Sequence, residues 1–136
     1  MSETTAKEIM SRELIHATED MTIEQALKIL IQYRITGLPV VNKHGVMSGV
    51  VSEFDIISQI SQSKQKGPQK FQQVITYSKK VNTIRDDTPL SKIVKKFMLS
   101  KFRRLPVLDK RGRLVGMITR RDLMRVFYYQ EKLGDQ

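Results

Sequence analysis

The chain has 136 residues, of which 40% are hydrophobic, and it contains no cysteine. This length suits one compact domain or two small halves that share a core. The absence of cysteine excludes disulfides, thiolate zinc sites and a cysteine nucleophile. The net charge of +10 belongs to the second half, because residues 1–60 hold 5 basic and 8 acidic residues whereas residues 61–136 hold 19 and 6.

No segment approaches the roughly 18 apolar residues of a membrane helix, and the N-terminal sequence MSETTAKEIM lacks the basic and apolar regions of a secretory signal. We therefore expect a soluble, cytoplasmic protein that makes no membrane contact. The basic second half would attract polyanions, nucleotides, nucleic acid or an acidic protein surface in a salt-dependent way. Composition does not choose among these partners.

The first predicted elements, in chain order, are a short strand around residues 14–17 and an amphipathic helix. Thr22 stands at the start of this helix. A second helix with the same pattern starts at Pro89, where proline's missing N–H has no effect because the first N–H groups of a helix have no partner within it. A strand is likewise expected around residues 81–84. Apolar residues with the i, i+3, i+4, i+7 spacing of one buried helix face occur in both copies: Ile23, Ala26, Leu27, Leu30 and Ile31, and then Leu90, Ile93, Val94, Phe97 and Met98.

A β-hairpin and a second helix follow in each copy. The polar turn NKHG at residues 42–45 separates two apolar runs, and DKRG at 109–112 repeats it, which predicts two hairpins. Ser52 or Thr119 then begins a helix as its N-cap. The apolar residues of these second helices are Phe54, Ile56, Ile57 and Ile60, and Leu123, Met124, Val126 and Phe127.

An internal duplication explains this parallel order of elements. A shift of 67 residues, from 38 to 105, aligns LPVV with LPVL and GVVSEFD with GMITRRD without a gap. Residues 37–55 and their counterparts share seven identities: Leu38, Pro39, Val40, Lys43, Gly45, Gly49 and Asp55. The prediction is an α/β fold with α+β layering, in which two β-α-β-β-α repeats (5–60 and 71–130) pack with pseudo-twofold symmetry around a linker at 61–70. A short helix is expected at 71–77, matching residues 5–10 before the first copy.

The hydroxyl and the aspartate of each repeat suggest a binding site. A helix N-terminus attracts phosphate through free N–H groups and partial positive charge, and an ionised aspartate accepts two hydrogen bonds, which suits a ribose diol. A glycine on the preceding strand allows a ligand or a backbone to come close. The same S/T-x-x-D pattern is also close to a capping box, so capping without binding is the competing interpretation.

The tandem LPVV/GVVSEFD and LPVL/GMITRRD sequences, with their preceding helices, resemble a pair of cystathionine-beta-synthase (CBS) domains, also called a Bateman module, over residues 5–130. The resemblance implies β-α-β-β-α repeats, disc-like homodimers and a regulatory, non-enzymatic role. It also implies that the module binds an adenosine-type ligand, such as AMP, ADP, ATP or S-adenosylmethionine, between the repeats, and that the module requires no cofactor. The regulated protein is not named by the sequence.

The resemblance also carries residues into the two sites. Ser52 and Asp55 mark one site and Thr119 and Asp122 the other, each with residues from the opposite repeat: Thr36, Gly37, Ile15 and His16 toward Asp122, and Tyr77, Asn82, Thr83, Arg103 and Arg104 toward Asp55. Pro39 and Pro106 of the LPV motifs complete the set. The two arginines are candidate phosphate ligands and could serve either site, since guanidinium grips phosphate with two hydrogen bonds.

The two motifs differ in charge. Arg120 and Arg121 stand between hydroxyl and acid in the second copy, where the first copy has Glu53 and Phe54. We therefore expect phosphorylated ligands at Thr119/Asp122, and neutral or cationic ligands at Ser52/Asp55.

Other chemistry has little support in the sequence. His16 and His44 are single histidines, which argues against a metal site, and no catalytic constellation or nucleotide-binding fingerprint is present. Two alternatives stay open. One is a ligand-free structural or protein-interaction module. The other is a nucleic-acid-binding protein that uses the basic second half.

Overall fold

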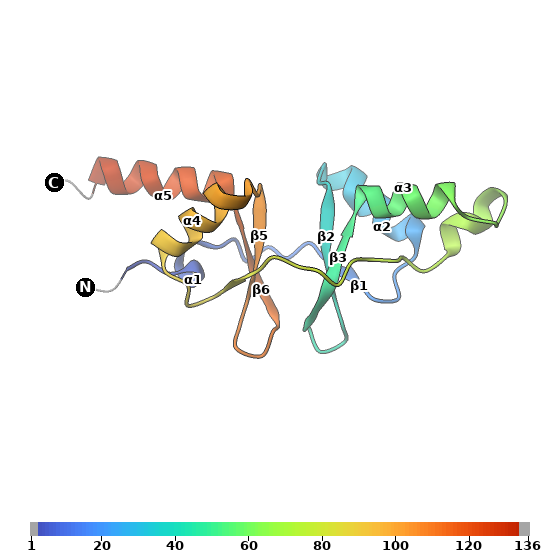
Figure 1. The fold of residues 1–136 in the computed structure, drawn as a ribbon, viewed down its shortest axis with the longest axis horizontal. Helices are drawn as coiled ribbons and strands as arrows, with labels where there is room; N and C mark the ends of the chain where they lie inside the picture. The colour runs from blue at the N-terminus through green and yellow to red at the C-terminus, as the bar shows by residue number, and fades with distance from the viewer. Residues whose placement is uncertain (1–2, 134–136) are drawn as a thin grey trace. The chain divides into compact units, whose positions relative to one another are not determined.

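The structure is a computed structural model that describes residues 3–133, with side chains described for residues 3–130. The chain forms two compact units that each contain a three-stranded sheet (Figure 1). Unit 2 comprises residues 15–81, and unit 1 comprises residues 1–14 and 82–136. The elements in chain order are α1 (Ala6–Ile9), β1 (Ala17–Thr18), α2 (Ile23–Tyr33), β2 (Gly37–Val41), β3 (Met47–Ser52), α3 (Glu53–Ser61), the 3-10 helix η1 (Gly67–Gln72), β4 (Ile84–Arg85), α4 (Leu90–Ser100), β5 (Arg104–Leu108), β6 (Leu114–Thr119) and α5 (Arg120–Leu133).

The two units have the same mixed topology, which confirms the predicted α/β class and the duplication. In unit 2 the strand order is β1-β2-β3, with β1 parallel and β3 antiparallel to β2. Unit 1 repeats this order with β4-β5-β6. Both predicted hairpins are present, and their glycines, Gly45 and Gly112, each have a φ of 79°, a left-handed conformation that glycine adopts without strain.

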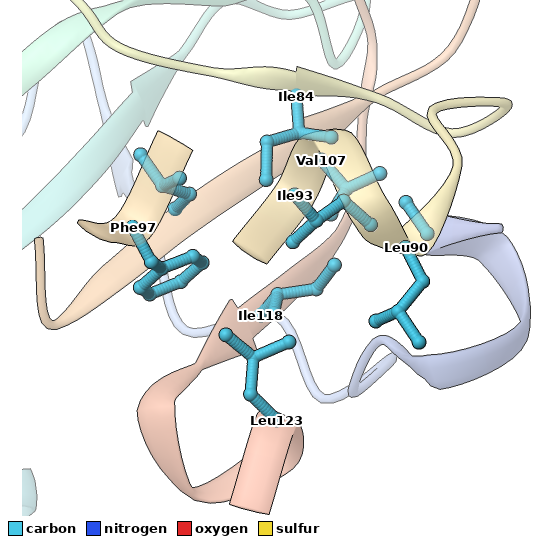
Figure 2. Packing of buried hydrophobic residues seen from close by; sticks show 9 residues of the cluster. Ile84, Leu90, Ile93, Phe97, Val107, Ile118 and Leu123 are labelled. Carbon is cyan, nitrogen blue, oxygen red and sulfur yellow. The ribbon is translucent and has the colours of Figure 1, made fainter. Parts of the chain in front are cut away.

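A separate apolar core stabilises each unit. The core of unit 2 is formed by Ala17, Ile23, Ala26, Leu30, Leu38, Val40, Val51, Ile56 and Ile75. The core of unit 1, shown in Figure 2, is formed by Ala6, Ile84, Leu90, Ile93, Phe97, Leu105, Val107, Ile118 and Leu123. Because strands and helices contribute to both lists, each sheet buries one set of side chains beneath its own two long helices.

Each unit also contains a chain segment that precedes the other repeat in the sequence. The N-terminal segment pairs with unit 1, where Ser11 and Met117 exchange two backbone hydrogen bonds of 2.9 Å. The segment at 73–78 pairs with unit 2, where Val50 and Ser78 exchange two more. Each compact unit therefore combines one repeat with the leading segment of the other, because hydrogen bonding joins that segment to its sheet.

Three local expectations differ from the structure. The helix predicted at 71–77 is wrong: a 3-10 helix lies earlier, at Gly67–Gln72, where Pro68 fits the first turn. The 3-10 helix also begins inside the predicted linker, at Gly67. The short strands lie further along the chain than predicted, at 17–18 and 84–85, because they pair with the C-terminal ends of β2 and β5.

The predicted helix faces are only partly buried. Ile23, Ala26 and Leu30 of α2 are buried as expected, but Ile31 at the next stripe position is 73% exposed. Its counterpart in α4, Met98, is also 73% exposed. The remaining predicted apolar residues that are exposed lie on α3 and α5: Phe54, Ile57, Met124 and Phe127. Among the described residues, no helix is long and apolar enough to cross a membrane.

Candidate functional site

Ser52 and Asp55 form a complete capping box where β3 passes into α3. The backbone N–H of Asp55 donates to Ser52 Oγ at 3.1 Å. In return, Asp55 Oδ2 accepts from the backbone N–H of Ser52 at 2.8 Å and from its hydroxyl at 2.9 Å. One carboxylate oxygen is thus occupied by the cap, while Oδ1 accepts no hydrogen bond from the residues that the structure describes.

Thr119 and Asp122 repeat this box where β6 passes into α5. Asp122 Oδ2 accepts from the backbone N–H of Thr119 at 2.7 Å and from its hydroxyl at 3.0 Å, and the N–H of Asp122 donates to Thr119 Oγ1 at 3.3 Å. Asp122 is buried, with only 7% of its surface exposed. Its second oxygen, Oδ1, accepts from Arg125 Nη1 at 3.3 Å. The two boxes therefore differ in whether Oδ1 is already engaged.

Sequence reasoning did not single out Arg125. The signal is present in the spacing, since residues three apart on a helix are neighbours and can form an ion pair. The first copy has Ser58 at the equivalent position. Arg125 is more than half exposed, so this ion pair contributes only about 0–1 kcal/mol to the free energy of unfolding. The guanidinium can therefore readily exchange Asp122 for another partner.

Arg120, which the sequence placed between hydroxyl and acid, is engaged in helix capping. Its Nε donates to the carbonyl of Phe102 and its Nη2 to the carbonyl of Lys101, both at 2.8 Å, just beyond the C-terminus of α4. The last carbonyl groups of a helix have no N–H partner within the helix, and these two carbonyls lie in that region. The guanidinium of Arg120 is therefore directed to the end of α4, while the neighbouring Arg121 is exposed.

Unit 2 brings several predicted site residues beside the Ser52 cap. The carbonyl of Thr36 accepts from the backbone N–H of Glu53 at 2.8 Å, and Gly37 pairs with Ser52 in the sheet. Pro39 is buried within β2. The other predicted residues of this unit lie elsewhere in it: Ile15 packs against the core, His16 is exposed, and the hydroxyl of Tyr77 donates to Glu19 Oε2 at 3.4 Å.

Unit 1 places both predicted arginines beside the Thr119 cap. Arg104 pairs with Thr119 in the sheet, and the carbonyl of Arg103 accepts from the backbone N–H of Arg120 at 3.1 Å. Arg104 is half-buried, and this desolvation lowers the pKa of its guanidinium from its usual value. The other predicted site residues that lie in this unit are Pro106, which is buried in β5, Asn82, which is exposed, and Thr83, whose carbonyl accepts from Lys96 Nζ. Pairings that join residues of the two units stay predictions.

The glycine of each motif accommodates a leading chain segment. A Cβ added at Gly49 would lie 2.2 Å from the carbonyl oxygen of Ser78 and 2.6 Å from the ring of Tyr77. At Gly116 the added atom would lie 2.2 Å from the sulfur of Met10. The close approach expected at these glycines therefore occurs, and a backbone makes it at Gly49 and a side chain at Gly116.

Asp55 also lines a polar depression of about 460 Å³ along α3. Its other lining residues are Ser58, Gln59, Gln62, Ser63, Lys64, Gln73 and Thr76. Gln59 holds one wall in place, since its carboxamide donates to the carbonyl of Val74 at 2.8 Å and accepts from the N–H of Thr76 at 2.9 Å. Within the described part of the chain, no group of three histidines, cysteines or acidic residues could hold a metal ion.

Comparison with known proteins places these motifs in a family. The CBS domain family matches the chain twice, over residues 6–62 and 73–129. The L-aspartate semialdehyde sulfurtransferase of Methanocaldococcus jannaschii is 32% identical over 124 residues, which are 91% of this chain and 23% of that enzyme. The chloroplastic CBS domain-containing protein CBSX2 of Arabidopsis thaliana is 31% identical, over 84% of this chain and 59% of that protein. The chain thus spans less than two thirds of the length of either relative.

Two solved structures share both sequence and fold with the chain. The CBS domain pair of protein MJ0100, in complex with 5′-methylthioadenosine and S-adenosyl-L-methionine, is 30% identical with a TM-score of 0.69, and the match covers 94% of this chain and 98% of that one. CBSX2 in complex with AMP is 29% identical with a TM-score of 0.72, and the match covers 93% of this chain and 98% of that one.

Proposed function

The chain belongs to the CBS domain family, and from this membership we propose that it is a regulatory, non-enzymatic module that binds an adenosine-type ligand at its two Ser/Thr-x-x-Asp motifs. AMP, ADP, ATP and S-adenosylmethionine are the candidate ligands. The observation that carries the proposal is Oδ1 of Asp55, which accepts no hydrogen bond from the residues that the structure describes. Because Oδ2 holds the helix cap, the cap and a ribose hydroxyl can be bound at the same time.

The relatives support an adenosine-type ligand. The MJ0100 pair holds 5′-methylthioadenosine and S-adenosylmethionine, and CBSX2 holds AMP. These molecules share an adenine ring and a ribose diol but differ in charge at the 5′ position. A site built around a carboxylate therefore suits all of them, and the charge around that carboxylate would decide among them.

We propose that the two motifs divide ligands by this charge. Arg125 lies beside Asp122, and Arg104 pairs with Thr119, so the second motif is cationic. A ribose hydroxyl that takes Oδ1 of Asp122 would release Arg125, whose guanidinium could then bind the ligand's phosphate. The first motif has Ser58 and Glu53 instead, which favours an uncharged or cationic 5′ group.

The proposed mode of action is a population shift. A ligand that contacts residues of both units stabilises the arrangement of the units that it fits, and a partner protein can respond to that arrangement. We propose that the chain acts as a homodimer and that its target is a separate, still unidentified protein. The repeat boundaries at 5–60 and 71–130 and the cytoplasmic location stay predictions.

A thermal-melting screen tests the proposal. Protein freed of endogenous nucleotide is heated with AMP, ADP, ATP, S-adenosylmethionine and 5′-methylthioadenosine, and with 2′-deoxyadenosine monophosphate as a control that lacks the diol. A ligand at 100 times its Kd adds about 2.7 kcal/mol to the free energy of unfolding, which at this size raises Tm by about 8 °C. Melting curves that stay unchanged for all compounds would refute adenosine binding.

Two matched variants locate the sites. Asp55→Asn and Asp122→Asn each keep the shape of the capping residue but remove the carboxylate charge. If the motifs divide ligands by charge, Asp122→Asn weakens the binding of AMP and Asp55→Asn weakens the binding of 5′-methylthioadenosine. Titration calorimetry measures both affinities. Arg125→Gln should weaken the binding of AMP while leaving the affinity for 5′-methylthioadenosine unchanged. Equal losses for both ligands in every variant would contradict the division.

Salt-dependent binding to nucleic acid that is insensitive to both aspartate variants would favour the nucleic-acid alternative.

A further inference from the structure

A single arginine at the start of α5 donates hydrogen bonds to three consecutive carbonyl groups. The backbone N–H of Arg120 donates to the carbonyl of Arg103 at 3.1 Å. Its Nε and Nη2 donate to the carbonyls of Phe102 and Lys101, both at 2.8 Å. These acceptors belong to residues 101–103, here called the α4–β5 loop, which join α4 to β5. Arg120 therefore holds the α4–β5 loop over its whole length.

The α4–β5 loop begins in an unfavourable backbone conformation. Lys101 ends α4 with a φ of 53°, in the left-handed region that residues other than glycine seldom adopt. Arg34 has the same φ at the end of α2, but there the backbone N–H groups of Arg34 and Ile35 donate back to carbonyls of α2 at 3.3 and 3.2 Å. Among the described residues, the N–H groups of Lys101 and Phe102 form no equivalent bond. The side chain of Arg120 thus takes over in unit 1 what the backbone does in unit 2.

The first repeat lacks this side-chain contact. Glu53 occupies the position of Arg120, and its backbone N–H donates to the carbonyl of Thr36 at 2.8 Å, just as the N–H of Arg120 donates to Arg103. An ionised carboxylate has no hydrogen to donate, so the side chain of Glu53 cannot bind further carbonyls. The repeats therefore share the backbone bond and differ only in the contacts of the guanidinium.

The α4–β5 loop leads two arginines to the Thr119 cap. Arg103 is the last residue of the loop, and Arg104, the first residue of β5, pairs with Thr119 in the sheet. Within the described part of the chain, no hydrogen bond or ion pair engages either guanidinium. Both are available to an anion, and a guanidinium that is held in place in advance binds phosphate more tightly than a mobile one.

We propose that Arg120 is a positioning residue for phosphorylated ligands: it fixes the α4–β5 loop so that Arg103 and Arg104 can bind the phosphate of a nucleotide at the Thr119/Asp122 motif. Arg120 itself does not touch the ligand, because its guanidinium is directed to the end of α4. The inference rests on the proposed function and adds the contact that makes the second motif selective for phosphate.

The affinities for AMP and for adenosine separate phosphate recognition from nucleoside recognition. Both are measured by titration calorimetry in the Asp55→Asn background, which weakens binding at the first motif. Arg120→Met is expected to weaken the binding of AMP about tenfold to a hundredfold, the range for losing hydrogen bonds to a charged group, and to leave the affinity for adenosine unchanged. Arg121→Met is the matched control, because it removes the same charge from a neighbouring, exposed side chain. Equal losses of AMP affinity in the two variants would overturn the proposal.

Arg120→Lys separates the position of the charge from the charge itself. Lysine keeps the positive charge but lacks the planar fork that spans two carbonyls, so most of the affinity for AMP should be lost in this variant as well. A lysine variant that binds AMP as tightly as the natural chain would show that charge alone is sufficient, which overturns the positioning role.

Lys101→Gly separates positioning from stability. Glycine adopts the left-handed conformation without strain, so adding Lys101→Gly to Arg120→Met should restore Tm but not the affinity for AMP. Lys101→Gly alone controls for the lost lysine charge. If the affinity for AMP recovers together with Tm, Arg120 has only a structural role and the proposal is wrong.

Amide hydrogen exchange of residues 101–104, measured without ligand, reports the loop directly and should be faster in Arg120→Met than in the natural chain. Unchanged exchange combined with lost AMP binding would mean that Arg120 contacts the phosphate itself, which also overturns the proposal. These outcomes refute only the present inference. A natural chain that does not bind AMP would instead refute the proposed function, and the inference with it.

Discussion

Gly49 and Gly116 occupy equivalent positions, yet the structure predicts very different effects when each is replaced by alanine. At Gly49 the new Cβ would lie 2.2 Å from the carbonyl oxygen of Ser78, so the backbone of the 76–78 segment must move. That movement breaks two hydrogen bonds of 2.9 Å between Val50 and Ser78. At Gly116 the obstacle is the side chain of Met10, whose sulfur and Cγ can rotate away.

The expected magnitudes follow from these contacts. For Gly49→Ala, two lost hydrogen bonds at about 1 kcal/mol each and about 1–2 kcal/mol of overpacking lower the free energy of unfolding by about 3–4 kcal/mol. With roughly 3 °C per kcal/mol at this size, Tm falls by about 10 °C. For Gly116→Ala, mild overpacking is partly offset by the reduced flexibility of the unfolded chain, so the change stays within about 1 kcal/mol.

Urea unfolding followed by circular dichroism measures both variants. A double variant, Gly116→Ala with Met10→Ala, serves as a control, because removal of the obstructing side chain should make the glycine substitution neutral or slightly stabilising relative to Met10→Ala alone. Equal losses in the free energy of unfolding for Gly49→Ala and Gly116→Ala would contradict this prediction. So would a Gly49→Ala variant whose free energy of unfolding lies within about 1 kcal/mol of that of the natural protein.

Two further predictions concern charged residues. Arg120→Met should lower the free energy of unfolding by about 1–2 kcal/mol, because two carbonyls beyond α4 lose their donor, whereas Arg121→Met should change it by less than about 0.5 kcal/mol; equal effects in urea unfolding would contradict this assignment. The backbone N–H of Arg113, with further donors in the turn, lowers the pKa of Asp109, so its charged form stabilises the hairpin above the ordinary carboxyl pKa of about 4 and this stability is lost at lower pH. Asp109→Asn should remove that part of the acid dependence of Tm, and an unchanged pH profile would refute it.

The hairpins show how far local sequence can be used. Asn42 and Asp109 occupy the same position before their turns, and each side chain accepts from two backbone N–H groups of its own turn. These contacts join residues two to four apart, and the turn residues between two apolar runs were enough to predict both hairpins, though not these contacts. The helix caps at Ser52 and Thr119 were predicted for the same reason.

Contacts between distant segments could not be predicted in this way. Arg125 was overlooked because its partner depends on the side-chain conformation of Asp122, and Arg120 was expected near a ligand although its donors reach the end of α4. The helix faces were expected to be buried throughout. Ile31 continues the apolar period of α2 but extends beyond the core of its own unit.

The sequence by itself determined the duplication, the order of the elements, the capping boxes and the family, because each of these is written in short-range spacing that is repeated twice. Only the tertiary structure decided which leading segment joins which sheet. Residues 73–78 pair with unit 2 and the N-terminal segment with unit 1, although the sequence places each directly before the other repeat. Backbone hydrogen bonds can form between any two segments that come together, so only the folded chain shows that Gly49 lies against Tyr77 and Ser78, and Gly116 against Met10.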